Sequence, residues 1–449
     1  MKSSKVKTFK KEKAMNMTTA IKWTLGCLIG ILSLNTFAAD PTIGQVTVRQ
    51  RWPWSRLVDI DYVLNGDSAQ RYNIALTAYD GSTPLSLPLA SVSGDLESVS
   101  AGARKIIFDP TKTSYANSEV MTQFSVTLTP MAPPLYMIVD LTMSAGAPGQ
   151  IVYVTEADLT NNVWDAGAWV RNPVTNNGTA VQSVIWTGVT NGTTYKTDKL
   201  VLRRVPGGSY QLGDTQTGAN NVTLTKDMYV GVFEVTQQQW NRIMTDGTGT
   251  DTQAKHTVSY YDIRENPANT DDPAVNWPLN KNVTALSFMG KLRTKTGISE
   301  FDLPTEAQWE YLCRAKTTTV FNDGDTNAVW AGSVDDNNAT TNKYLNALGW
   351  YKWNKPTVPT AANPVGGKLP NAWGLYDTHG NVWEWCLDWN ATNAELGTDP
   401  EGAGSGSDRV IRGGGWNNPA SVCRSAFRYG DTPSRRGSDF GFRLVRTLP

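Results

Sequence analysis

Histidine and cysteine are scarce in this chain of 449 residues, which contains two histidines and four cysteines. With only His256 and His379, one copy of the chain cannot supply three imidazoles to an iron centre. No serine has a recognisable histidine and acid partner, so the sequence does not indicate serine nucleophile chemistry. With so few cysteines, the folded chain depends on its apolar cores and not on disulfide stapling.

The chain also lacks an excess of charge and a long apolar run. It has 41 basic and 41 acidic residues. The apolar run at 23–34 is too short to span a membrane. It follows a basic stretch at 1–13 and precedes Ala38 and Ala39, an arrangement that predicts a secretory signal at residues 1–39. A non-cleaved anchor is the alternative.

Removal of the signal changes the charge balance of the chain. The mature chain keeps 34 basic and 40 acidic residues, a net charge of about −6. A mildly acidic surface offers no footprint for nucleic acid or anionic lipid. We therefore expect a secreted, periplasmic or cell-surface protein without a membrane span after cleavage. Its expected partner is an extracellular protein, peptide or glycan.

The segment 40–135 has the two-residue periodicity of β-strands. Val58, Ile60, Tyr62 and Leu64 alternate with Asp59 and other residues, and similar short runs follow up to Leu128. Short strands at this spacing, without a helical stretch, predict an all-β sandwich of the Ig-like kind. Residues 136–196 are interpreted as a connector that has one strand at 136–141. We expect it to be partly packed, because three tryptophans within it would be costly to expose: Trp164, Trp169 and Trp186.

From residue 197 to 449 the pattern is that of a mixed α and β domain rich in loops. Thr236 with Gln239, and Thr305 with Gln308, have the spacing of helix capping boxes. A further helix is predicted at 284–293. Beyond Cys313 the sequence is mostly glycine, tryptophan and turn residues, and large rings suit a core that little regular structure organises.

Several uncommon segments occur in order within this second half, ending with GFRLVR at Arg446: PGGSYQLGD, YVGVFEVTQQQW, LPTEAQWEYLCRA, GLYDTHGNVWEW and RVIRGGGW. Together they resemble the formylglycine-generating enzyme, or sulfatase-modifying factor, superfamily over about residues 197–447. The resemblance implies a loop-rich α+β fold related to C-type lectins. It also implies that Arg412, Arg428 and Arg443 occupy the family's arginine positions, where we expect buried, paired guanidinium groups.

Enzymes of this family use oxygen and a copper(I) ion held by two thiolates to oxidise a sulfatase cysteine to formylglycine. The resemblance places the two thiolate positions at Asn418 and Cys423, so one thiolate is missing. The serine that lines the family's oxygen pocket is replaced by Gly415, whereas Trp383 matches the pocket tryptophan. The candidate catalytic residues are therefore Cys423 and Trp383 alone, and copper is not expected.

The three cysteines of the mature chain, Cys313, Cys386 and Cys423, allow two readings. A copper site could be rebuilt from Cys423 with Cys386. Alternatively, the resemblance implies that Cys313 is disulfide-bonded to the strand after the active-site segment. Cys423 is then its plausible partner, and Cys386 is the other candidate. We favour the disulfide, because the compartment is expected to be oxidising.

The resemblance also implies a structural calcium ion held by the segment 377–384. Its side-chain ligands would be Asp377 and Glu384, and its carbonyl ligands Gly380 and Val382. Two carboxylates and backbone oxygens in one tight loop suit a hard cation. The alternative is a turn whose acids accept backbone N–H groups. His379, in the same loop, is expected to be a hydrogen-bonding residue and not a metal ligand.

Three hypotheses about function follow. The first is a secreted sulfatase-modifying-factor-like protein without copper oxidase chemistry, which acts as a binding and recognition scaffold. The second is an oxidase that converts a sulfatase active-site cysteine to formylglycine. The third and weakest is a structural surface protein whose two domains act as spacers.

Overall fold

The computed structural model describes the chain in a series of ranges, with only the backbone of 174–176 and 179–181 between residues 154 and 192. The described ranges are 41–51, 55–68, 70–85, 87, 91–113, 123–147, 149–154, 192–214, 220–247, 251–265, 274–324, 343–355 and 361–449. The predicted signal at 1–39 and the tryptophans Trp164, Trp169 and Trp186 lie outside the described residues.

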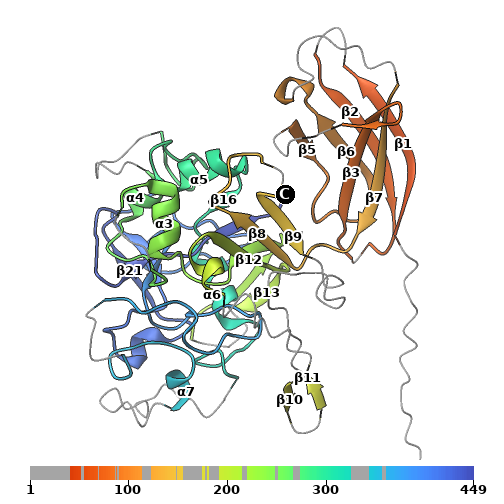
Figure 1. Cartoon of the computed structure of the whole chain (residues 1–449). Coiled ribbons are helices and arrows are strands. Elements are labelled where there is room, and N and C mark those ends of the chain that lie inside the picture. The colour runs from red at the N-terminus through yellow and green to blue at the C-terminus, as the bar shows by residue number, and fades with distance from the viewer. Residues whose placement is uncertain are drawn as a thin grey trace, which may run out of the picture. The chain divides into compact units, whose positions relative to one another are not determined.

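The N-terminal segment forms two antiparallel sheets (Figure 1). One sheet has the order β1-β2-β6-β5 and the other β4-β3-β7. The strands are β1 (Thr42–Gln50), β2 (Val58–Asn65), β3 (Asn73–Asp80), β4 (Thr83–Pro84), β5 (Val92–Gly94), β6 (Gly102–Phe108) and β7 (Phe124–Met131). Both sheets contribute to one apolar core, in which Ile60 and Ile106 of the first sheet meet Ile74 and Leu128 of the second.

The alternation read from the sequence holds in β2, with one difference. Ile60, Tyr62 and Leu64 are buried as predicted. Asp59, on the opposite face, is also buried, because Arg51 donates two hydrogen bonds to its carboxylate at 2.7 and 3.0 Å. A charged side chain of the outer face is thus covered by its ion-pair partner.

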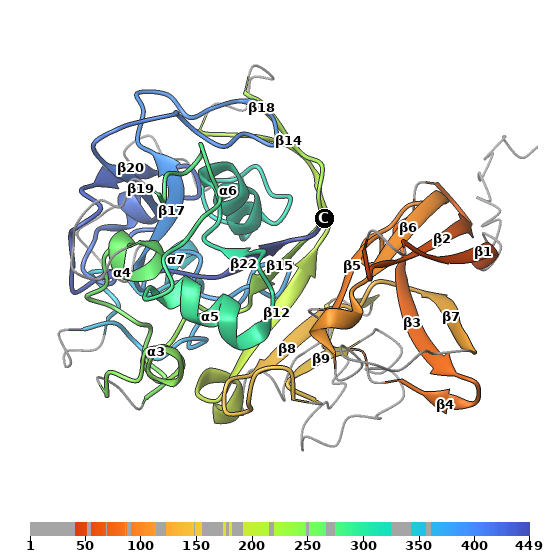
Figure 2. The same cartoon turned by 90° about the horizontal axis from the view of Figure 1, so that it is seen from above.

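The strand predicted at 136–141 is confirmed as β8, but this first part of the expected connector belongs to a larger sheet. Two of its segments, β8 (Tyr136–Asp140) and β9 (Ile151–Val154), are strands of a six-stranded sheet with the order β16-β22-β15-β12-β8-β9. Figures 1 and 2 show β8 beside β12, with β9 on the other side of β8. The other strands are β12 (Lys199–Val205), β15 (Met228–Gly231), β16 (Phe301–Asp302) and β22 (Val445–Thr447). The sheet forms because Tyr136–Asp140 is apolar on both faces, as a central strand requires.

Two smaller sheets and a hairpin complete the β-structure. The order β20-β19-β17-β21 unites β17 (Trp383–Trp389), β19 (Arg409–Arg412), β20 (Arg428–Asp431) and β21 (Phe440–Gly441). The order β13-β14-β18 unites β13 (Gly208–Gln211), β14 (Asn221–Leu224) and β18 (Gly397–Thr398). The hairpin pairs β10 (Val174–Asn176) with β11 (Thr179–Val181).

The helices are short, and side chains cap the N-termini of α3, α4, α5 and α6. They are α3 (Gln237–Met244), α4 (Tyr260–Arg264), α5 (Phe288–Thr296), α6 (Glu306–Arg314) and α7 (Lys343–Asn346), with 3-10 turns η2 (Pro110–Lys112), η3 (Thr193–Lys196) and η4 (Ala420–Cys423). The capping boxes predicted at Thr236 and Thr305 are confirmed. The helix predicted at 284–293 is displaced: Ser287 is its N-cap and Gly297, with φ +72°, its C-cap.

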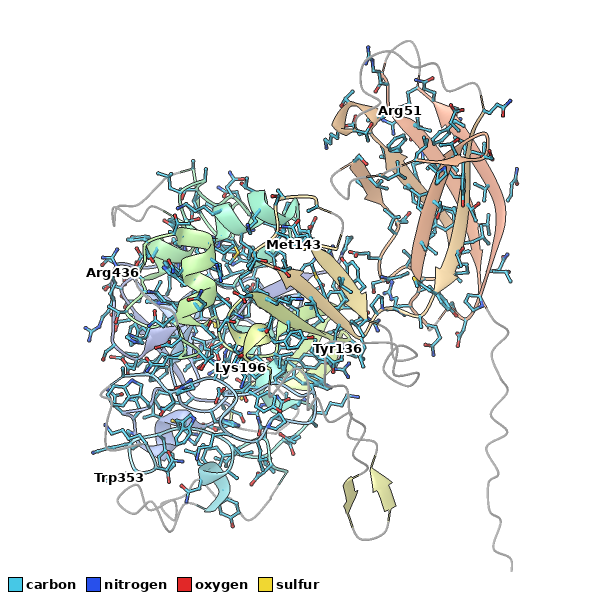
Figure 3. All side chains as sticks on the ribbon, in the orientation of Figure 1. Arg51, Tyr136, Met143, Lys196, Trp353 and Arg436 are labelled. Carbon is cyan, nitrogen blue, oxygen red and sulfur yellow. The ribbon has the colours of Figure 1, made fainter. Side chains whose placement is uncertain are left out.

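The core beneath these elements is rich in aromatic rings. Trp240 stacks on Phe288 with 5.1 Å between ring centroids, and Trp385 meets Tyr260 edge-on at 6.1 Å. On the sheet, the Arg203 guanidinium lies 4.8 Å from the ring centroid of Tyr136, which Figure 3 labels. Among the described residues, none of the helices combines the length and apolar character that a membrane crossing needs.

Candidate functional site

The loop that follows β19 makes its turn at two glycines, Gly413 and Gly414. At these positions a side chain would be strained or would collide with its neighbours. Gly413 and Gly414 have φ of +89° and +74°, a region that favours glycine. A Cβ added at Gly414 would lie 2.7 Å from the Sγ of Cys423. The glycine pair therefore lets the loop fold directly over this cysteine.

Asn418, at the position of the missing thiolate, closes a turn with Gly415. Its side-chain oxygen accepts a hydrogen bond from the Gly415 N–H at 2.8 Å, and its own N–H donates to the Gly415 carbonyl at 3.0 Å. The Asn418 carbonyl in turn accepts from the N–H of Lys352 at 2.9 Å. The residue therefore has a structural role in the loop.

The side chain of Asp439 also lies at Gly415, and the sequence did not point to this residue. A Cβ added at Gly415 would lie 2.8 Å from the Oδ2 of Asp439 and 2.9 Å from its Cβ. The acid thus takes up the space beside Gly415 where the family has a serine side chain. Burial raises the pKa of the Asp439 carboxyl. Its place just before the GFRLVR segment was the signal available in the sequence.

Trp383 lies next to Asp439 and is part of an aromatic wall. Its backbone N–H donates to the backbone carbonyl of Asp439 at 2.7 Å. The parallel pairing of β17 with β21 begins at the same place. Its ring lies 6.1 Å from the ring centroid of Phe427 and 6.0 Å from that of Tyr429. Trp383 is buried, whereas Tyr429 is 55% exposed. The wall therefore presents an aromatic face to solvent at Tyr429.

The three described cysteines are buried and form no disulfide in this structure. Cys313 packs in one cluster with Trp309, Cys386 and Val410, whereas Cys423 packs in another, around Phe321. The expected bond between Cys313 and Cys423 is therefore not formed. Cys386 and Cys423 also do not combine into a pair of thiolates. With Asn418 committed to its turn, these residues do not fit a two-thiolate copper(I) site.

His379 separates Cys313 from Cys423. Its Nε2 accepts a hydrogen bond from the Asn322 N–H at 3.2 Å, so its Nδ1 carries the proton and donates to the Cys423 carbonyl at 2.8 Å. The Sγ of Cys313 lies 3.9 Å from both ring nitrogens. Burial lowers the pKa of His379 to about 4, so the ring is neutral. Its predicted role as a hydrogen-bonding loop residue is confirmed.

The segment 377–384, where calcium is expected, holds one partner of a buried ion pair, because Glu384 is the acid with which Arg443 pairs. Arg443 donates to both oxygens of Glu384, from Nε to Oε2 at 2.7 Å and from Nη2 to Oε1 at 2.6 Å. The indole N–H of Trp309 donates to Oε2 at 2.8 Å. Glu384 therefore already has three charge-assisted or indole donors.

Asp377 has a different environment, which leaves one oxygen available. Its Oδ2 accepts from the Gly366 N–H at 2.6 Å, but its Oδ1 is buried without a hydrogen-bond partner. Burial raises the pKa of Asp377 to about 6. The residues thus fit calcium in part: Asp377 offers an unpartnered oxygen, whereas Glu384 already accepts hydrogen bonds at both of its oxygens.

Glu234, which the sequence reasoning missed, is the third acid of this cluster. It accepts hydrogen bonds from the Asn381 side chain and, at 3.2 Å, from the Val382 N–H. Burial raises its pKa well above the ordinary range, and the charge of Asp377 adds to the shift. Within the described ranges, no group of three or more His, Cys, Asp or Glu side chains is arranged to hold a metal ion. The expected calcium set uses only two such side chains.

The remaining family arginines are paired as predicted. Arg412 is buried against Glu310, and Arg428 donates to both oxygens of Glu306 at 2.7 and 2.9 Å. Their guanidinium groups bridge α6 to β19 and β20. The prediction of buried structural arginines is confirmed for Arg412 and Arg443, whereas Arg428 is partly exposed.

Comparison with known proteins agrees with these features. Residues 190–448 match the family model described as "Sulfatase-modifying factor enzyme 1-like domain". The chain is 30% identical over 286 residues to the "Chaperone protein LppX" of Paenibacillus barcinonensis, covering 58% of this chain and 92% of that protein. It is 35% identical to the formylglycine-generating enzyme of Streptomyces coelicolor and 34% identical to that of Bos taurus. Each of these two matches covers 32% of this chain, and 46% and 38% of the enzymes, respectively.

A solved structure of PvdO from Pseudomonas aeruginosa is similar at 21% identity and a TM-score of 0.42, over 56% of this chain and 95% of that one. The chain spans less than half the length of the two formylglycine-generating enzymes, but nearly all of the chaperone. The family model covers more than half of the chain. The chain therefore belongs to the sulfatase-modifying factor enzyme 1-like family.

Proposed function

We propose that this chain is an exported recognition protein, which binds an extracellular protein, peptide or glycan at the former reactive pocket without copper-dependent oxidation. The observation that carries the proposal is the turn between Asn418 and Gly415, at 2.8 Å, in place of a thiolate. A soft copper(I) ion needs the sulfur ligand that Asn418 does not provide.

The side chains around this turn support recognition. An exposed tyrosine of β20, Tyr429, lies 6.0 Å from the ring centroid of a buried tryptophan of β17, Trp383, and the half-buried carboxylate of Asp439 lies beside Gly415. Aromatic rings with a few polar groups are typical of binding sites. The likeness to a protein named as a chaperone, over 92% of its length, also favours a role in binding another protein.

Formylglycine formation is the second candidate, favoured by 34–35% identity to formylglycine-generating enzymes. A mass-spectrometric assay separates the two. A Cys-x-Pro-x-Arg peptide is incubated with the mature protein, copper(I), oxygen and a thiol reductant. We expect an unchanged peptide with the wild type and with Asn418→Cys, because Asp439 crowds Gly415 and Cys423 is buried. Conversion beside an active positive control would establish the oxidase.

Binding itself is tested by selecting phage-displayed peptides, and by screening a glycan array, on the immobilised mature chain. We expect ligands that bind Tyr429→Ala at least about tenfold more weakly than the wild type, a change of about 1.4 kcal/mol. Leu286→Ala is the matched control, because Leu286 is 67% exposed and lies outside the aromatic wall. Ligands that bind Tyr429→Ala as tightly as the wild type would contradict the proposal. Failure to select any ligand would also contradict it.

Calcium belongs to the same proposal as a structural ion. The unpartnered Oδ1 of Asp377 supports a cation there, in the same loop as Gly380 and Val382. Glu384 would enter the coordination only by giving up part of its pairing with Arg443. The ion would hold the loop that leads into β17, and thereby position Trp383.

A further inference from the structure

The stretch 337–376 is unusual for this chain because its charged residues are all lysines. It contains no aspartate or glutamate, whereas the mature chain has 40 acidic and 34 basic residues; its lysines are Lys343, Lys352, Lys355 and Lys368. Within the described ranges, no carboxylate forms a salt bridge with Lys352, Lys355 or Lys368. Positive charge is therefore concentrated in one stretch of an otherwise acidic chain.

Two of these lysines belong to one turn that packs against the turn of Asn418. The Lys355 N–H donates to the Tyr351 carbonyl at 3.1 Å, which is the bond of a single helical turn. Residues three apart on such a turn are neighbours on its surface, as Lys352 and Lys355 are. The Lys352 N–H donates to the Asn418 carbonyl at 2.9 Å. Both lysines therefore border the proposed recognition site.

The ammonium groups of these two lysines lie over indole rings. The Nζ of Lys355 is 4.2 Å from the ring centroid of Trp416. The Nζ of Lys352 is 4.5 Å from the ring centroid of Trp353, which Figure 3 labels. An aromatic face attracts an ammonium group but carries no charge that would neutralise it. The positive charge at this turn thus stays available to an anion.

A third lysine is held close by. The Nζ of Lys368 lies 4.0 Å from the ring centroid of Trp350 and donates to the Asn346 carbonyl at 2.7 Å. The Trp350 carbonyl accepts from the Asn381 N–H at 2.8 Å, and the Asn381 carbonyl accepts from the Trp416 N–H at 2.8 Å. Trp350 and Trp416, each with a lysine over its ring, are therefore linked through one residue.

Two acids lie near these lysines. Asp439 lies beside Gly415, in the same turn as Asn418. Burial lowers the pKa of Lys368, and the charge of the buried Asp377 opposes that shift. Three ammonium groups against two carboxylates leave a net positive charge, which is greatest at Lys352 and Lys355.

The indole N–H groups of this surface are not available to a ligand. Those of Trp350 and Trp353 are buried, and that of Trp416 donates to the Ser438 carbonyl at 3.4 Å. They therefore cannot donate to the hydroxyl groups of a sugar, which favours a peptide over a glycan. The ammonium group of lysine is a compact charge on a flexible stem, which suits carboxylates that are spaced along a peptide.

We infer that this lysine–tryptophan surface binds an acidic segment of a peptide, whose carboxylates pair with the ammonium groups. The surface consists of Lys352, Lys355 and Lys368 with Trp350, Trp353 and Trp416. The inference rests on the proposed function and names its ligand class. Lys352 and Lys355 provide the main contacts, because they share one turn beside Asn418.

The test uses an acetylated and amidated heptapeptide, Gly-Glu-Gly-Glu-Gly-Glu-Gly, and its counterpart with glutamine in place of glutamate. Each is titrated into the mature chain by ligand-observed NMR. We expect the glutamate peptide to bind at least about tenfold more tightly. Added salt should reduce this preference, because exposed charges are screened.

Four substitutions, made in pairs, locate the binding surface. Lys352→Gln with Lys355→Gln should abolish the preference, and Lys352→Arg with Lys355→Arg should keep it because the charge remains. Lys226→Gln with Lys316→Gln is the matched control, since it removes the same charge from two exposed lysines elsewhere. The control should bind the glutamate peptide as the wild type does. Melting temperatures of all variants establish that each is folded.

Equal binding of the two peptides, or binding of neither, would overturn the inference. A preference that survives the loss of Lys352 and Lys355, or that the control also loses, would do the same. Trigalacturonate, a sugar with three carboxylates, is the third probe. If it bound in place of the glutamate peptide, the ligand would be an anionic glycan and the inference would be wrong. The proposed function is judged separately: screened ligands that depend on Tyr429 but lack acidic residues would support recognition and contradict the acidic peptide.

Discussion

The carboxylate of Glu384 and the guanidinium of Arg443 form a bidentate ion pair in which both side chains are 1% exposed. Arg443 also donates to the carbonyls of Gly231 and Tyr376 at 3.1 and 2.9 Å. One guanidinium thereby ties β17 to β15 and to the loop before Asp377. This pair therefore holds together segments that are far apart in the sequence.

Neutralising one member of this pair should be costly. Glu384→Gln leaves the Arg443 charge buried without its counter-ion, so we expect a loss of about 3–5 kcal/mol in the free energy of unfolding. Chemical denaturation in the presence of EGTA measures this loss independently of calcium. The control is Asp198→Asn, whose partner Arg242 is 41% exposed, and it should cost less than about 1 kcal/mol. Equal, small losses would show that the pair contributes little.

The thiols of the mature chain should be buried and reduced. Burial raises the pKa of Cys313 to about 12, so its reactive thiolate is suppressed in the folded protein. Alkylation without reductant, followed by intact mass measurement, should add no adduct to the native protein. In denaturant it should add one adduct for each of Cys313, Cys386 and Cys423. A single adduct in denaturant would instead establish the disulfide that the family resemblance implied.

Stability should depend on pH through Asp388, a residue of β17 whose carboxylate contacts the N-terminus of α6. Its Oδ2 accepts from the Glu306 N–H at 2.7 Å, and burial, with the charge of Glu306, raises its pKa to about 8. The folded state therefore retains a proton that the unfolded chain releases near pH 4. Stability is fully present below pH 4 and falls as pH rises towards 8, by up to about 1.4 kcal/mol per pH unit.

Asp388→Asn keeps an oxygen that can accept from Glu306 but cannot titrate. Thermal unfolding between pH 5 and pH 8 should therefore show a smaller decrease in melting temperature for this variant than for the wild type. Identical pH profiles for the two proteins would exclude a raised pKa at Asp388.

Calcium should raise the melting temperature, and Asp377 should be required for this effect. The reason is the buried Oδ1 of Asp377, which has no hydrogen-bond donor of its own. We expect EGTA to lower the melting temperature of the wild type and of the control Asp408→Asn, but not that of Asp377→Asn. A wild type that is indifferent to both EGTA and added calcium would contradict the predicted ion.

The sequence predicted those features that depend on residues close together in the chain, such as helix caps and the alternation of strands. Thr236 and Thr305 cap their helices because the partner that completes each box lies three residues away. Ile60 and Tyr62 face a core because strands alternate, and the arginines near the C-terminal strands were recognisable from the family segments. Position 418 alone identified the missing thiolate.

Longer-range relationships required the tertiary structure. The strand β8 joins the C-terminal sheet because β12, about 60 residues later, offers it an unpaired edge. His379 reaches between Cys313 and Cys423 because two loops meet there. Asp439 and Gly415 are 24 positions apart in the sequence, yet one leaves space for the other. The sequence by itself determined the family and predicted the missing thiolate at position 418, since residue identity is local. Only the fold decided which charges are compensated, because ion pairing depends on distances that sequence separation does not encode.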